Sequence, residues 1–84
     1  MSRVIVERSF DPPITQDGID AVGERIGGCL ELYGVRWIGS HVSIDRKRMV
    51  CVYEAADAQS VREVQNAAQA QFDRVWPADI MAPD

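Results

Sequence analysis

The feature that most constrains this fold is the alternation of two apolar periodicities along 84 residues. Four short stretches are rich in the β-branched and aromatic residues that favour strands, at 3–10, 35–44, 48–54 and 73–76. After the first and the third of them, apolar residues recur at three- and four-residue steps, which is the spacing of one helix face. The order predicts one α+β domain over residues 1–84 with the pattern β-α-β-β-α-β.

Cap and turn residues mark the expected boundaries. Pro12 and Pro13 end the first strand, because proline donates no hydrogen bond to a sheet. Thr15 and Asp57 are suitable N-caps for the two helices, and Gly34 is placed to stop the first one. The polar stretch 45–47 predicts a hairpin between antiparallel strands. Residues 78–84 form a tail that we expect to be loose or packed on a partner subunit.

Charge and hydropathy exclude several classes of partner. The net charge is −4, and the basic residues are scattered apart from the cluster at 46–48, which disfavours nucleic-acid binding. No apolar run approaches the roughly 20 residues that span a bilayer, and the first residues do not resemble a secretion signal. We therefore expect a cytoplasmic protein without nucleic-acid or membrane partners.

Strand alternation sorts the side chains into two faces, because two helices after the first and third strands cover only one side of the sheet. The predicted helix-facing set is mostly aliphatic: Val4, Val6, Ile38, Val42, Ile44, Val50, Val52 and Val75, with Glu54 at its end. The predicted open face carries Ile5, Glu7, Trp37, His41, Met49, Cys51, Tyr53 and Trp76. Aromatic residues on a bare sheet need a cover, so we expect a homodimer formed through the sheets.

This open face holds the candidate sites. Ligand contacts are expected from large side chains in a pocket at the dimer interface: Trp37, Met49, Tyr53 and Trp76. Imidazole and thiolate groups suit nickel and similar ions, so His41, Glu7 and Cys51 are the candidate metal ligands.

Two other hypotheses remain open. In a small isomerase or cyclase-like enzyme, Glu7, His41 and Tyr53 would transfer protons. The third hypothesis is a non-catalytic interaction module. All versions of the site assume regular strands, and a bulge at Gly39 would redirect the neighbouring side chains.

The helices carry two further expectations. Glycines at 18, 23, 27 and 28 weaken the first helix, and we attribute them to close approach between helix and sheet. In the second helix Val61 and Val64 point inward and Gln65 faces water. A chain of this length leaves little volume to enclose, so no large internal cavity is expected.

The stretches VIVERSF, LYGVRWIGSHVSID, VCVYEAADAQSVRE and FDRV together resemble a family of small bacterial domains of unknown function that includes a nickel-binding, nickel-responsive protein. The resemblance implies a ferredoxin-like domain that is dimeric through its sheets and binds nickel. Members have histidine, serine and tyrosine in strand two and a histidine in helix two, where this chain has Gly39, Ser40, His41 and Val64. His41 would then replace the missing imidazoles.

Overall fold

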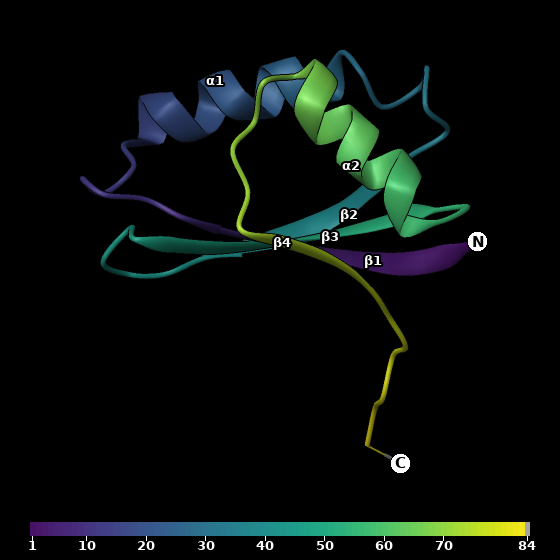
Figure 1. The fold of residues 1–84 in the computed structure, drawn as a ribbon. Coiled ribbons are helices and arrows are strands. Elements are labelled where there is room, and N and C mark those ends of the chain that lie inside the picture. Colours follow the sequence, from purple (N-terminus) through teal and green to yellow (C-terminus); the bar gives the residue numbers. More distant parts are fainter. Residues whose placement is uncertain (84) are drawn as a thin grey trace.

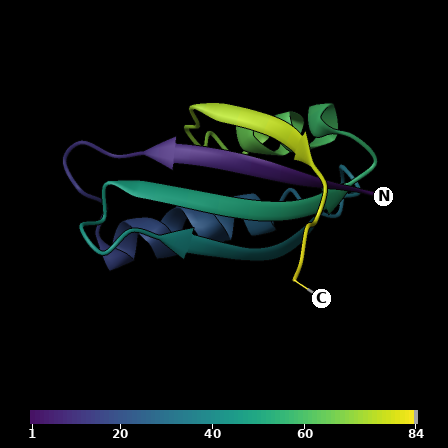
Figure 2. The same ribbon diagram turned by 90° about the horizontal axis from the view of Figure 1, so that it is seen from below.

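The computed structural model describes residues 1–83 and contains four strands and two helices in the predicted order (Figure 1). The elements are β1 (Ser2–Ser9), α1 (Gln16–Gly27), β2 (Arg36–Val42), β3 (Arg48–Ala55), α2 (Ala58–Ala67) and β4 (Arg74–Ala78). The strands form one antiparallel sheet in the order β2-β3-β1-β4. Both helices lie on the same side of it, and Figure 2 shows the other side without helices. This is the expected ferredoxin-like α+β fold.

The predicted caps are present at both helix starts. Thr15 Oγ1 accepts the Gly18 amide at 3.1 Å, and Asp57 Oδ1 accepts the Ser60 amide at 2.8 Å. The first helix ends at Gly27, earlier than the expected stop at Gly34. Gly34 instead occupies a turn at φ +65, a conformation that glycine adopts without steric cost.

The register between β1 and β3 confirms one half of the face assignment and corrects the other. Val4 pairs with Tyr53, and Val6 pairs with Cys51. Directly paired residues share a face, so Tyr53 and Cys51 point toward the helices with the two valines. Val50, Val52 and Glu54 therefore lie on the open face, opposite to the prediction, and Met49 joins the helix side. Residues of both parities in β3 are apolar, so their alternation could not decide which face points toward the helices.

A register shift between Trp37 and Gly39 corrects the prediction for β2. Trp37 pairs with Tyr53 and lies on the helix side, whereas a regular strand would have placed it with His41. Its indole Nε1 donates to Ser40 Oγ at 2.9 Å, a contact between residues three apart that a regular strand would hold on opposite faces. His41, after the bulge, stays on the open face as predicted.

The hydrophobic core lies between the sheet and mainly α2. From α2 it receives Val61 and Val64, both fully buried, whereas Ile26 is the one buried side chain of α1. Gln65 is also fully buried, so its expected contact with water is wrong. α1 is therefore the lightly packed helix of the pair.

The strand β4 continues through Pro77, which an edge strand tolerates because one side of it needs no partner. Residues 79–83 then leave the sheet without helix or strand and extend to the side opposite the helices (Figure 1). The last residue of the expected tail, Asp84, lies outside the described residues. Neither α1 nor α2 has the length and apolar character required to cross a bilayer.

Candidate functional site

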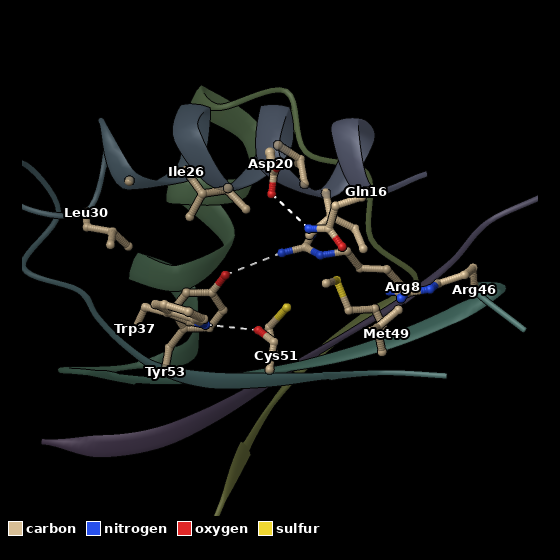
Figure 3. Close-up of a pocket in the computed structure, with 16 residues that line it drawn as sticks. Arg8, Gln16, Asp20, Ile26, Leu30, Trp37, Arg46, Met49, Cys51 and Tyr53 are labelled. Atoms are coloured by element: carbon tan, nitrogen blue, oxygen red, sulfur yellow. Dashed lines mark hydrogen bonds between the residues drawn. The ribbon is translucent and has the colours of Figure 1, made fainter. Parts of the chain in front are cut away.

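A pocket of about 530 Å³ opens between α1 and the helix-facing side of the sheet (Figure 3). Its floor is formed by Met49, Cys51 and Tyr53 of β3, and Ile19 and Ile26 of α1 cover it. Small-molecule sites commonly enclose about 300–1,000 Å³ and are mainly apolar with a few polar groups. The pocket opens to the surface, so the expectation that this short chain has no large internal cavity stays a prediction.

The glycines of α1 explain the space. Gly23 and Gly27 line the pocket, and a Cβ added to either would meet no atom within 4 Å. A close approach of helix and sheet, the reason expected for these glycines, would have placed atoms there. The missing side chains instead leave room between the helix and the sheet.

A buried arginine forms the polar part of the floor. Arg8 follows Val4 and Val6 at two-residue steps along β1 and shares their face, so its side chain points toward the helices. Only 3% of the residue is exposed. Nη1 donates to the Gln71 carbonyl at 3.0 Å, and Nη2 donates to Gln65 Oε1 at 2.6 Å. Nε has no hydrogen-bond partner among the described residues. The charge is thus held by neutral acceptors rather than by a carboxylate.

Tyr53 completes this polar cluster. Its hydroxyl accepts from Arg8 Nη2 at 3.4 Å, a long contact drawn in Figure 3. Burial raises the pKa of the Tyr53 phenol, and the neighbouring Cys51 adds to the rise, while the Arg8 charge opposes it. The phenol is therefore neutral at physiological pH and keeps its proton for donation.

The rim of the pocket is more polar than its interior. Trp37 lines it with 55% of the residue exposed, and Arg46 and Asp20 bring opposite charges to the edge. The Asp20 carboxylate accepts a hydrogen bond from Gln16 Nε2 at 2.9 Å. Arg46 and Asp20 are both exposed, so Arg8 is the one charged residue of the pocket lining that is buried.

The open face carries a second group of predicted site residues. Glu7 Oε2 accepts the indole N–H of Trp76 at 2.8 Å. Glu7 and His41 both pair with Val50, from β1 and β2 on either side of β3. Their backbones are thus two strand spacings apart, roughly 10 Å. Both residues lie on the open face.

The structure separates the predicted metal and catalytic sets. Glu7 and His41 share the open face, whereas Cys51 and Tyr53 lie on the helix side, so the four do not share one concavity. Within residues 1–83 no three His, Cys, Asp or Glu side chains are arranged to hold a metal ion. The physical reason is that Cys51 and Tyr53 of β3 face the helices and not the open side of the sheet. In the part of the chain that the structure describes, these residues do not fit a nickel site within one copy.

Three of the four predicted ligand contacts lie together. Trp37, Met49 and Tyr53 line one pocket, although it lies under α1 and not on the open face. Trp76 lies on the other side of the sheet, where it pairs with Ile5.

Sequence reasoning missed Arg8 and Gln65 as site residues. For Arg8 the signal existed, because it shares the parity of Val4 and Val6 and is therefore a charge on the core face. Gln65 follows Val64 directly, and its helical position alone does not distinguish it from exposed polar neighbours.

Comparisons with known proteins agree with the sequence resemblance. A family model described as "Nickel responsive protein SCO4226-like" matches residues 5–77. The crystal structure of SCO4226 from Streptomyces coelicolor A3(2) is similar with a TM-score of 0.86, covering 96% of this chain and 100% of that chain at 15% identity. At this identity the likeness supports the fold alone. No curated protein matches the chain.

Proposed function

We propose that this chain, which belongs to the SCO4226-like family of nickel-responsive proteins, binds a small molecule in the pocket under α1. The observation that carries the proposal is a pocket of about 530 Å³ whose mainly apolar lining includes the buried Arg8. Such an arrangement provides apolar contact for a ligand together with one polar anchor that fixes its orientation.

The chemistry of the lining supports binding more than catalysis. Acid–base catalysis requires a proton donor and acceptor at reacting distance from the substrate. Of the described residues that line the pocket, Asp20 supplies the one carboxylate. It lies at the rim and accepts a hydrogen bond from Gln16. The cluster of Arg8, Tyr53 and Gln65 donates and accepts hydrogen bonds without such a pair.

Fluorescence of N-phenyl-1-naphthylamine, a neutral apolar dye, tests the proposal. We expect saturable enhancement with the unmodified chain and a loss of at least tenfold in affinity for Cys51→Phe, which enlarges a side chain on the pocket floor. The matched control is Val50→Phe, on the same strand and the opposite face, which should bind as the parent does. Absence of saturable binding, or equal weakening by both changes, would refute a site under α1.

A second candidate, transition-metal binding, is supported by the shared orientation of Glu7 and His41. Within residues 1–83 no third His, Cys, Asp or Glu side chain is arranged with these two to hold a metal ion, so a nickel site there would need ligands from a second copy. The same face exposes Trp76 to 42% and carries Ile5, Val50 and Val52, which supports pairing of two chains through their sheets. Light scattering in dilute solution tests this, and a dimeric mass is expected.

A further inference from the structure

We infer that the ligand of the α1 pocket is an organic monocarboxylate whose carboxylate group binds Arg8 and whose apolar part fills the space beneath α1. The inference rests on the proposed small-molecule function and adds the chemical class of the ligand. It starts from the charge balance of the buried guanidinium.

A buried ionised side chain is costly unless an opposite charge or a full set of hydrogen bonds compensates it. Arg8 is 97% buried, as its exposed fraction is 3%. The ion pair present among residues 1–83 joins Arg3 to Glu54 on the open face, and no described carboxylate pairs with Arg8. The positive charge under α1 thus lacks a counter-charge within the described chain.

The hydrogen bonds of the cluster are also incomplete. Guanidinium has five N–H donors, and three are directed at Gln71, Gln65 and Tyr53. Arg8 Nε and the amide nitrogen Nε2 of Gln65 are both buried without a partner. Of these groups Arg8 lines the pocket together with the neutral Tyr53 hydroxyl, so both offer donors to a ligand there, and an incoming carboxylate has two oxygens that accept several hydrogen bonds.

The rest of the lining selects a monoanion with an apolar body. Met49, Cys51 and Ile26 line the same pocket and carry no cationic group for a second negative charge. Arg46 also lines the pocket, but it is exposed at the rim, where solvent and salt screen its charge. A phosphate, with up to two negative charges, would leave part of its charge uncompensated beside a single arginine.

The test compares 4-phenylbutyrate with its neutral isostere 4-phenylbutyramide as displacers of bound N-phenyl-1-naphthylamine. A charge-assisted hydrogen bond in a buried site favours the acid by about tenfold or more. With Arg8→Met we expect the acid to lose this advantage while the amide still displaces the dye. Arg46→Met, at the rim, is the matched control and should retain the preference for the acid.

The outcomes separate the two levels of the proposal. Dye binding with equal displacement by acid and amide, or an acid preference that survives in Arg8→Met, overturns the carboxylate inference and leaves the binding function standing. Failure of the dye to bind the unmodified chain overturns the proposed function itself. The comparison of acid and amide on the unmodified chain needs no variant, so equal displacement overturns the inference even if Arg8→Met does not fold, and loss of the acid preference in Arg46→Met would overturn its assignment to Arg8.

Discussion

Arg8 and Gln65 meet beneath the α1 pocket, where Nη2 of the guanidinium donates to Oε1 of the amide at 2.6 Å. The two residues are 57 positions apart in the chain, and the contact joins β1 to α2 inside the core. On the far side of the pocket, Ile26 is the only buried residue of α1, and it is 7% exposed. A firmly held polar floor under a lightly packed helix is the arrangement on which the binding proposal depends.

The open space beside the glycines of α1 predicts a stability difference. Gly23→Ala should raise the free energy of unfolding by about 0.5–1 kcal/mol, because alanine favours the helix and the added Cβ meets nothing within 4 Å. Gly34→Ala is the control and should lower it by about 1 kcal/mol, since residue 34 has φ +65. Urea unfolding measures both. Destabilisation by Gly23→Ala would contradict the open space under the helix.

The corrected assignment of the two faces of β3 predicts different outcomes for Val6 and Val52. Val6→Asp should unfold the domain, because Val6 is fully buried and an unpaired buried carboxylate costs several kcal/mol, comparable with the whole stability. Val52→Asp, on the half-buried open face, should keep a cooperative thermal transition in circular dichroism. If Val52→Asp also abolished folding, the register of β3 would be wrong.

The fold was more predictable from the sequence than the candidate site. The element order and the caps at Thr15 and Asp57 were predictable because they depend on local signals. The face of β3 that points toward the helices was not predictable. Residues 49–53 are apolar throughout, and only the pairing with β1 decides which side is buried. Gly39 marked the site of a bulge in the sequence, and the register shift lies between Trp37 and Gly39, but it moved Trp37 to the helix side and left His41 on the open face. The pocket depends on both events, so the candidate site was less predictable than the fold.

The buried phenol predicts a loss of stability at alkaline pH. The unfolded chain releases the Tyr53 proton near the usual pKa of 10.0, whereas the folded chain retains it to higher pH. The stabilisation is therefore complete below pH 10.0 and is lost as pH rises through the raised pKa.

Tyrosinate absorbance in a Tyr33→Phe background, which leaves Tyr53 as the sole tyrosine, should show this late titration. Urea unfolding across the same pH range should show a shallower loss of stability for Tyr53→Phe than for the parent. An equal loss in both would contradict the burial of the phenol under α1.

For the second candidate function, calorimetry with Ni²⁺ distinguishes the two faces of the sheet. If the open face binds nickel, His41→Ala should abolish the binding heat, because His41 supplies the imidazole. Cys51→Ser is the control on the pocket side and should bind nickel unchanged. Loss of binding in Cys51→Ser with retention in His41→Ala would place the metal under α1 instead.

The location of the ligand is tested most directly by amide proton and nitrogen chemical shifts during titration with 4-phenylbutyrate. The account predicts saturable shifts at Gly23 and Gly27 of α1 and at Cys51 on the pocket floor, with His41 and Trp76 on the open face unchanged. Shifts confined to the open face, or no saturable shifts at all, would contradict a carboxylate-binding pocket under α1.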